Sequence, residues 1–179
     1  MGGSAFALRA ATADDAPAIA AIYAEHVAHG TASFELQPPD AAEMRTRMTT
    51  LLAGGFPWIV AESVGEVVGY AYAGPYRPRR AYRFTVEDSV YLKPAAQGRG
   101  IGRALLSELI AACAARGHRQ MIAVIGDSAN TASIVLHARA GFVEAGRLAC
   151  VGRKFDRWLD IVIMQRALGD GAASAPAQP

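Results

Sequence analysis

The chain has 179 residues, a length typical of one domain, and 52% of them are hydrophobic, so it can bury one compact core and is unlike a disordered chain. Eighteen Lys and Arg against sixteen Asp and Glu give a formal net charge of +2, which is too small to indicate a nucleic-acid-binding protein. The two cysteines, Cys113 and Cys150, have no ligand spacing around them and predict neither a zinc site nor a disulfide framework.

Apolar runs in the sequence stay shorter than the roughly 18 residues that a membrane-spanning helix needs. The N-terminal stretch MGGSAFALRA lacks the basic and apolar regions of a signal peptide. We therefore expect a soluble, cytoplasmic protein.

The first elements alternate as in an α/β domain. A short strand is expected at residues 6–9, and Thr12 with Asp15 forms a capping-box pattern ahead of apolar residues at helical spacing. Asp40 and Glu43 repeat that signal ahead of a second helix. The sequence therefore predicts two helices after the first strand.

Two strand-like segments follow, PWIVAES at 57–63 and EVVGYAYAG at 66–74. Val64-Gly65 between them is typical of a tight hairpin turn, which predicts an antiparallel pair. At the other end, GDGAASAPAQP at 169–179 is small, Pro-rich and without periodicity. We expect a disordered tail there, after a single domain formed by residues 1–168.

A strand, a glycine-punctuated turn and an amphipathic helix follow one another in residues 83–112. Gly98, Gly100 and Gly102 fall where the helix begins, and free backbone N–H groups with the positive end of the helix dipole favour an anion such as pyrophosphate there. Their spacing fits neither the dinucleotide fingerprint nor a nucleotide triphosphate loop. A tight turn that needs positive φ explains the glycines equally well.

Asp88 interrupts the strand before these glycines. It falls on the same parity as four apolar residues that look buried, Phe84, Val86, Val90 and Leu92. A β-bulge at residues 87–89 would resolve the conflict, and bulges are common beside active sites. The alternative is an Asp at a sheet edge or in an ion pair.

Several segments resemble a known family. Gln97-Gly98-Arg99-Gly100-Ile101-Gly102 is similar to the acetyl-CoA motif of the GNAT superfamily of N-acetyltransferases. More narrowly, AYAGPYRPRRAYRFTVEDSVYL, AVIG and GRKFDRWLDIVIMQ resemble the phosphinothricin and methionine sulfoximine acetyltransferases. The resemblance implies the α/β GNAT fold, a twisted mixed sheet splayed between strands four and five with helices on both faces. It also implies acetyl-CoA as cosubstrate, a small-molecule amino-acid substrate and a homodimer, with no metal, nucleic acid or membrane.

By this resemblance the strand at residues 90–92 pairs its backbone with pantetheine, while the glycine turn wraps the pyrophosphate. Asn130, which also fits a helix N-cap, is expected to contact pantetheine. The full set expected at acetyl-CoA is Val90, Tyr91, Leu92, Gln97, Gly98, Arg99, Gly100, Ile101, Gly102, Arg103 and Asn130.

The resemblance also assigns two catalytic residues. Glu87 matches the Glu that accepts the amine's proton, directly or through water, and the alternative is a structural carboxylate that caps the bulge. Backbone N–H groups freed at that bulge would face the thioester oxygen. His137 stands where family members carry the residue that serves the leaving thiolate, although a lone His on a helix is usually structural.

The loop at residues 75–82 concentrates three arginines around a proline. Such charge runs are usually solvated, but Arg can grip a carboxylate or phosphinate through two N–H groups. By resemblance, the set expected at the amino-acid substrate is Phe34, Arg77, Arg79, Tyr82, Thr85 and Glu87. Trp158 matches a family motif and is expected to pack rather than to recognise substrate.

The resemblance thus implies an acetyl-CoA-dependent N-acetyltransferase in which an amine attacks the thioester directly. The expected acceptor is the α-amino group of a small amino-acid analogue of the phosphinothricin, methionine sulfoximine or methionine sulfone type. Two alternatives stay open: a GNAT enzyme for another amine such as a peptide N-terminus, and a non-catalytic acyl-CoA-binding module. The arginine loop argues against the first, and Glu87 argues against the second.

Overall fold

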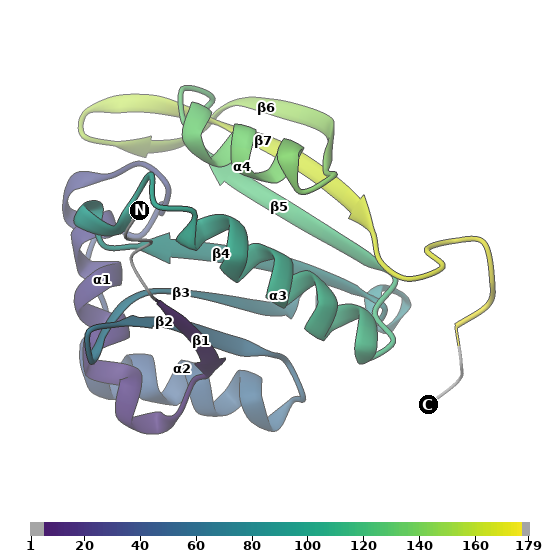
Figure 1. The fold of residues 1–179 in the computed structure, drawn as a ribbon. Helices are drawn as coiled ribbons and strands as arrows, with labels where there is room; N and C mark the ends of the chain where they lie inside the picture. The colour runs from purple at the N-terminus through teal and green to yellow at the C-terminus, as the bar shows by residue number, and fades with distance from the viewer. Residues whose placement is uncertain (1–5, 177–179) are drawn as a thin grey trace.

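A seven-stranded mixed sheet in the order β1-β2-β3-β4-β5-β7-β6 forms the centre of the molecule (Figure 1). The computed structural model of the protein describes residues 6–176. The strands are β1 Ala7–Ala10, β2 Trp58–Ser63, β3 Glu66–Pro75, β4 Thr85–Leu92, β5 Gln120–Gly126, β6 Val143–Lys154 and β7 Arg157–Ala167. The helices are α1 Ala16–His29, α2 Ala41–Ala53, α3 Ile101–Ala115 and α4 Thr131–Arg139, with short 3₁₀ turns at Ala13–Asp15, Arg80–Tyr82 and Pro94–Ala96.

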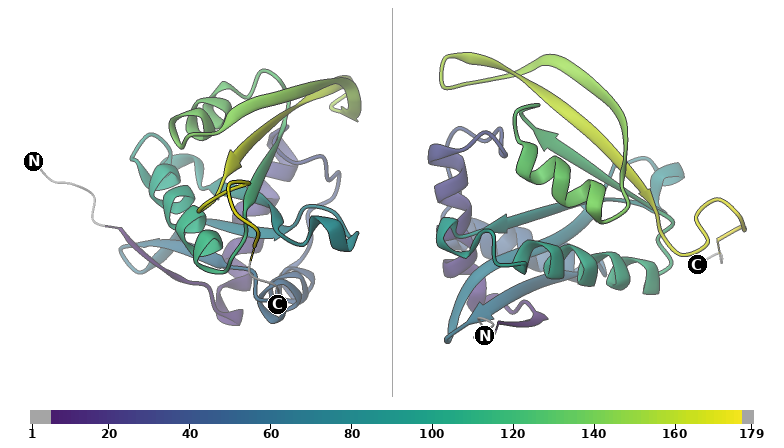
Figure 2. Two further views of the ribbon diagram at one scale, coloured as in Figure 1. Left: turned by 90° about the vertical axis from the view of Figure 1, so that its right-hand side faces the viewer. Right: turned by 45° about the horizontal axis from the view of Figure 1, so that its top comes forward.

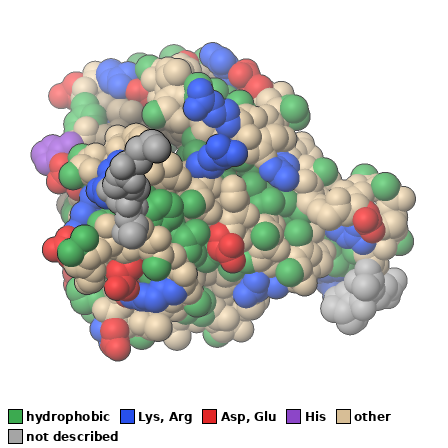
Figure 3. Space-filling model, viewed as in Figure 1, with side chains coloured by type: hydrophobic (Ala, Val, Ile, Leu, Met, Phe, Trp, Pro, Cys, Tyr) green, Lys and Arg blue, Asp and Glu red, His purple; other side chains and the backbone are tan. Residues whose placement is uncertain are grey.

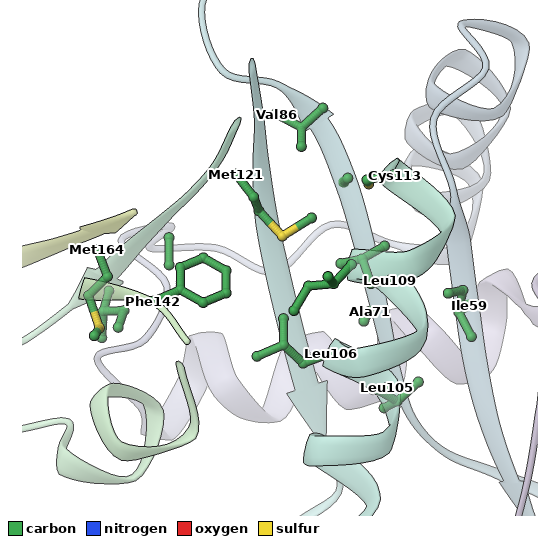
Figure 4. Close-up of a cluster of buried hydrophobic side chains, with 14 of the residues drawn as sticks. Ile59, Ala71, Val86, Leu105, Leu106, Leu109, Cys113, Met121, Phe142 and Met164 are labelled. Carbon is green, nitrogen blue, oxygen red and sulfur yellow. The ribbon is translucent and has the colours of Figure 1, made fainter. Parts of the chain in front are cut away.

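Helices cover both faces of the sheet, as expected for this fold class (Figures 1 and 2). α1 and α2 lie on one face, where Ile19 and Met48 pack with Tyr70 of β3. α3 and α4 lie on the other, where Leu106 of α3 packs with Met121 of β5 in the cluster drawn in Figure 4. Because strand residues alternate between faces, β2 and β3 each contribute buried residues to two separate cores.

Local signals in the first half of the sequence are confirmed. The side chain of Asp40 caps α2, since its Oδ1 accepts a hydrogen bond from the Glu43 N–H at 2.8 Å. Val64 and Gly65 both have positive φ, 52° and 77°, in the tight turn that joins antiparallel β2 and β3. The capping-box residue Asp15 ends a short 3₁₀ turn that leads into α1.

The prediction of a β-bulge at residues 87–89 is wrong. β4 pairs with β3 without a register shift from Gly69↔Leu92 to Pro75↔Val86. Asp88 therefore stays on the buried parity, where it is only 6% exposed. Its carboxylate is tolerated there because it meets His137 of α4, so the ion-pair alternative is the right one.

The predicted splay between β4 and β5 is confirmed, and it occurs without a bulge in β4. Their parallel pairing runs only from Thr85↔Gln120 to Asp88↔Ala123. Past Asp88, β4 continues to Leu92, while β5 continues to Gly126 and stays paired with β7. Two strands of one sheet thus separate at their C-terminal halves.

β6 and β7 form a long antiparallel hairpin at the sheet edge, and β6 was not delimited from the sequence. In Figure 1 the tip of this hairpin lies above the loop that follows α1. Within 169–176 there is no helix or strand, although Asp170 pairs with Arg119 at 3.4 Å. Residues 1–5 and 177–179 lie outside the described part, so the expected domain and tail boundaries stay predictions. None of the described helices is long and apolar enough to cross a membrane.

Candidate active site

A cleft opens where β4 and β5 separate. Its walls are residues 88–91 of β4, residues 123–126 of β5, and Asn130, Ser133 and His137 from α4 and its N-cap. Ala32, from the loop after α1, also lines it. Because the cleft passes between two strands, it connects the two faces of the sheet.

The backbone of β4 supplies hydrogen-bonding groups to this cleft. The Tyr76 N–H bonds the Thr85 carbonyl at 3.3 Å and the Lys93 N–H bonds the Val68 carbonyl at 2.9 Å, so odd-numbered residues of β4 face β3. The backbone groups of Val90 and Leu92 therefore face the splay, and those of Tyr91 do not. Pantetheine can pair with β4 through the even-numbered residues alone.

His26 of α1 is a contributor that sequence reasoning missed. Its Nε2 lies 2.8 Å from the Leu92 carbonyl, to which it donates. This contact satisfies one of the backbone groups at the splay and leaves the Val90 N–H and C=O and the Leu92 N–H for a ligand. The signal was hidden, because 66 residues separate His26 from its partner.

The glycine turn at the start of α3 is shaped by positive φ and also suits an anion. Gly98 and Gly100 have φ of 72° and 81°, and no described heavy atom lies within 4 Å of an added Cβ at either. No side chain of the described residues caps α3, and no acidic residue stands in its first turn. The free N–H groups of that turn, with exposed Arg99 and Arg103 beside them, fit a pyrophosphate.

The other residues expected around this turn divide into ligand-facing and structural ones. Gln97 is exposed, whereas Ile101 is fully buried in the core. An added Cβ at Gly102 would lie 3.3 Å from Leu92, so this glycine serves the packing of α3 on β4. Asn130 caps α4 by accepting from the Ser133 N–H at 3.2 Å and also lines the cleft, so both of its expected roles are compatible. Figure 3 shows Lys and Arg side chains over α4 and between α4 and α3, a setting that favours phosphates.

Glu87 lies on the α1 and α2 face of β4, opposite Gly74, and is half-buried. None of the described residues hydrogen-bonds its carboxylate. Burial raises the pKa of Glu87, the charge of Arg77 opposes that rise, and the charge of Asp88 adds to it. A free carboxylate with a raised pKa is suited to accept a proton near neutral pH.

His137 lies on the opposite face, 4% exposed and bound at both ring nitrogens. Nδ1 is 2.8 Å from the Ser133 carbonyl and Nε2 is 2.9 Å from Oδ2 of Asp88. A carbonyl and an ionised carboxylate both accept, so this setting favours the imidazolium form, with a proton on each nitrogen. Burial alone would lower the pKa of His137, but the hydrogen bond and charge of Asp88 with the Ser133 carbonyl raise it above 6.5. The two expected catalytic residues therefore lie on opposite faces of β4 and are not in contact, and of the two only His137 lines the cleft.

The arginine loop lies between β3 and β4. The guanidinium carbon of Arg77 is 4.8 Å from the centre of the Tyr76 ring, and the charge of Arg77 reaches Glu87. Tyr82 packs edge-on against Tyr76 at 5.7 Å. Arg79 is exposed, and the structure brings only Arg77 of the loop's arginines into reach of Glu87. Thr85 is half-buried at the first position of β4.

Phe34, in the loop after α1, lies against Gly126, which lines the cleft, and against Gly152 of β6. An added Cβ at Gly126 would lie 2.9 Å from the Phe34 ring, and one at Gly152 of β6 would overlap it. The Phe34 ring thus lies between the end of β5 and the outer hairpin, and its role as an apolar wall of the acceptor site stays a prediction. Trp158, by contrast, is 61% exposed, so the packing expected for it is not found within this chain.

Lys154 is the second residue that sequence reasoning missed. It is 5% exposed, and its Nζ donates to the carbonyls of Gly30 at 2.9 Å and Ser33 at 2.8 Å. Burial lowers the pKa of Lys154, and the charge of Glu35 opposes this. From the other side, the Tyr23 hydroxyl bonds Ser33 Oγ at 2.8 Å. The segment that carries Ala32 and Phe34 is therefore fixed between α1 and the tip of the hairpin.

Comparisons with known proteins agree with this geometry. The sequence profile described as Acetyltransferase (GNAT) family matches residues 19–142. The chain is 59% identical over 163 residues to the phosphinothricin N-acetyltransferase of Alcaligenes faecalis, covering 91% of this chain and 83% of that protein. It is 43% identical over 170 residues to the L-methionine sulfoximine/L-methionine sulfone acetyltransferase of Pseudomonas aeruginosa, covering 94% and 98%.

Among solved structures, the phosphinothricin acetyltransferase from Sinorhizobium meliloti in complex with AcCoA has a TM-score of 0.94 and 50% identity, covering 97% of this chain and 94% of that chain. The N-acetyltransferase from Staphylococcus aureus Mu50 follows the same fold with a TM-score of 0.89 at 38% identity, covering 93% and 100%. The match of the profile spans well over half of the chain, and the splayed strands and glycine turn occupy it. The chain belongs to the GNAT family of acetyltransferases.

Proposed function

We propose that the chain transfers the acetyl group of acetyl-CoA to the α-amino group of a small, anionic amino-acid analogue of the phosphinothricin, methionine sulfoximine or methionine sulfone type. The observation that carries this proposal is Glu87, without a hydrogen-bond partner among the described residues and under the charge of Arg77, next to Asp88, which lines the cleft. High identity to relatives that bear these names supports the acceptor class.

Each side of the cleft has its own task. When bound, acetyl-CoA supplies the acetyl thioester. Val90 and Leu92 offer backbone groups to its pantetheine arm, and residues 98–103 offer N–H groups and positive charge to its phosphates. On the other face, Glu87 takes the proton that the ammonium must lose before the nitrogen can attack.

In this proposal, the amino-acid substrate is held by the charge of Arg77 and by the apolar side chain of Phe34. Arg77 lies close enough to Glu87 for a carboxylate on Arg77 to bring the neighbouring α-amino group to the base. Phe34 bounds the acceptor at the end of β5. The set proposed at the substrate also keeps Arg79 and Tyr82 of the arginine loop and Thr85, the first residue of β4.

His137 is proposed to serve the departing thiolate. Its support is its place in the cleft wall and the contacts at both ring nitrogens, which favour the protonated imidazole. Because Nε2 is bonded to Asp88, release of that proton requires the bond to break. Backbone N–H groups at the splay, rather than at a bulge, are the donors proposed for the thioester oxygen.

We further propose a homodimer that works in the cytoplasm. Exposed apolar side chains gather on the β6–β7 hairpin, and a second copy of the chain would cover them: Val143, Leu148, Val151, Phe155 and Trp158. The two free cysteines, buried Cys113 and exposed Cys150, fit a reducing compartment. Light scattering on the protein and on Trp158→Ser tests the dimer. The dimer requires that the parent has the mass of two chains and that the variant has a lower mass.

A free-thiol assay with acetyl-CoA across a panel of amines tests the acceptor. We expect the highest kcat/KM with phosphinothricin, methionine sulfoximine or methionine sulfone. A peptide N-terminus that outperforms all three would replace this proposal with the alternative amine. Absence of CoA release with every amine, while calorimetry shows acetyl-CoA binding, would identify a non-catalytic acyl-CoA-binding module.

A further inference from the structure

One oxygen of a buried carboxylate in the cleft wall has no partner within the chain. The side chain of Asp88 is 1% exposed, and its Oδ2 lies 2.9 Å from Nε2 of His137. Its Oδ1 is also buried, and none of residues 6–176 donates a hydrogen bond to it. A buried acceptor that stays unpaired is costly, so this oxygen calls for a donor.

The polar side chains next to Asp88 are engaged elsewhere. His137 uses Nε2 for Oδ2 of Asp88 and Nδ1 for the Ser133 carbonyl, and Ser133 Oγ lies 3.3 Å from the same Nδ1. The side chain of Ser89 is bonded to Tyr72 on the other face of the sheet. A donor to Oδ1 therefore comes from a bound molecule, either a water or a ligand.

The cleft beside Asp88 is narrow. Its volume is ≈ 50 Å³, and Ala123 and Val124 of β5 form the wall opposite β4. A space of this size holds a water molecule or a slender chain but no ring. The pantetheine arm of acetyl-CoA is such a chain, and it carries two amide N–H groups.

The position of Asp88 along β4 indicates which of these N–H groups it meets. Asp88 is the last residue of β4 that pairs with β5, and the free backbone groups of Val90 follow two residues later. Glu87, the proposed base, directly precedes Asp88, so the sulfur of the thioester lies at this end of the cleft. The amide nearest to the sulfur is therefore the amide closest to Asp88.

We propose that Oδ1 of Asp88 accepts a hydrogen bond from the amide N–H of acetyl-CoA nearest to the thioester. Asp88 then binds the cofactor through its side chain, whereas Val90 and Leu92 bind it through their backbone. His137 holds the carboxylate through Oδ2, which leaves Oδ1 for the ligand. This inference rests on the proposed function, in which the pantetheine arm lies along β4.

His137 also makes a carboxylate compatible with this position. An isolated anion would repel the thiolate that departs as CoA. The imidazolium form of His137, with Nε2 2.9 Å from the carboxylate, makes the pair neutral as a whole. The pair thus offers the ligand a strong acceptor without a net charge.

Calorimetric binding of CoA and of two analogues tests this hydrogen bond. In the first analogue an oxygen atom replaces the N–H group nearest to the sulfur, and in the second the same replacement is made at the other amide. We expect the parent to bind the first analogue at least about tenfold more weakly than CoA, because an ester oxygen cannot donate to Oδ1. This measurement on the parent requires no variant.

Asp88→Asn then locates the acceptor. Asn keeps the size of the side chain and can accept from His137 through its carbonyl, but its NH₂ group then faces the ligand. In this variant the difference between CoA and the first analogue should fall to about twofold or less, while the second analogue should lose as much affinity as in the parent. Asp14→Asn changes an exposed carboxylate and should keep the full difference. Thermal unfolding verifies that both variants are folded.

Two results would overturn the inference. If the parent binds CoA and the first analogue equally, that N–H group has no acceptor in the protein, and a water molecule serves Oδ1. If Asp88→Asn shows the same loss with the first analogue as the parent, the N–H group is bonded elsewhere, for example to the Val90 carbonyl. No amine takes part in these measurements, so a negative result leaves the proposed acetyl transfer intact, which the free-thiol assay tests separately.

Discussion

Nε2 of His137 lies 2.9 Å from Oδ2 of Asp88, which joins α4 to β4 at the last residue of β4 that pairs with β5. Oδ1 of Asp88 is buried without a hydrogen-bond partner among residues 6–176. The carboxylate therefore depends on His137 for compensation. Removing either partner leaves an uncompensated polar group in the core.

We expect Asp88→Leu and His137→Leu each to lower the free energy of unfolding by about 3–5 kcal/mol, because each leaves the other partner unpaired. The double variant should lose less than the sum, since both polar groups are then gone. Urea unfolding of the four proteins measures this coupling. Additive losses would show that the pair does not act as a unit.

The same pair makes stability depend on pH. The folded-state pKa of His137 is raised above its ordinary 6.5, so the contribution of the pair is fully present below pH 6.5 and is lost as the pH rises through the folded-state value. The difference in unfolding free energy between the parent and His137→Leu should shrink over that range. A difference that stays constant from pH 5 to pH 9 would mean that His137 is not charged in the folded protein.

Replacing Glu87 by Gln keeps the size of the side chain and removes its basicity. We expect kcat to fall by roughly 10² to 10⁴, with calorimetric binding of acetyl-CoA unchanged. The exposed Glu108 of α3 supplies the control, because Glu108→Gln removes the same charge far from the cleft. Near-parent turnover in Glu87→Gln at neutral pH and saturating substrate would rule Glu87 out as the base.

Arg77 should set the pH at which the enzyme becomes active. Its positive charge opposes the raised pKa of Glu87, so Arg77→Gln raises that pKa further. The ascending limb of kcat/KM against pH should move to higher pH in this variant. Arg80→Gln, in the same loop, removes an exposed charge that does not act on Glu87 and should leave the limb in place.

Gly100 is required by its backbone conformation. With φ at 81°, Gly100→Ala should cost roughly 1–2 kcal/mol of unfolding free energy and weaken CoA binding about tenfold by distorting the first turn of α3. Gly146→Ala is the control, because its added Cβ also meets no described atom within 4 Å and its φ is not positive. Calorimetry and thermal unfolding measure both effects, and equal CoA affinity in the two variants would contradict the assignment of the turn.

Lys154→Met should remove the hydrogen bonds that fix the loop segment carrying Ala32. The carbonyls of Gly30 and Ser33, one part-buried and one buried, would lose their donor, which we expect to cost about 1–3 kcal/mol and to raise KM for the amine acceptor more than for acetyl-CoA. Arg153→Met changes the neighbouring exposed residue and should stay within about 0.5 kcal/mol of the parent. A KM effect on acetyl-CoA alone would place the role of Lys154 elsewhere.

Features that depend on nearby residues were predictable from the sequence. The Asp40 cap, the Val64-Gly65 turn and the positive φ at Gly98 each follow from chemistry within a few residues. The resemblance supplied the splay and the order of the elements. Long-range side-chain contacts were not predictable, since the partners of His26 and Lys154 lie 66 and more than 100 residues away.

The error at Asp88 has a definite physical cause. Parity alone treats a charged residue on an apolar face as a conflict and resolves it by moving the backbone. The protein resolves it by placing a hydrogen-bonding imidazole opposite, and that group, His137, comes from a helix 49 residues away. Local patterning could not distinguish these two solutions.

The contact of Lys154 with the Gly30 and Ser33 carbonyls ties the outer hairpin to the loop that follows α1. The splay and the glycine turn lie within residues 19–142, which match the family profile, whereas Lys154 and Gly152, which contact the segment that carries the proposed acceptor wall, come after it. Substitutions in the last two strands can therefore reshape the amine pocket without touching the groups proposed for CoA. Acceptor preference can diversify among such enzymes while their hold on the common acetyl donor stays the same.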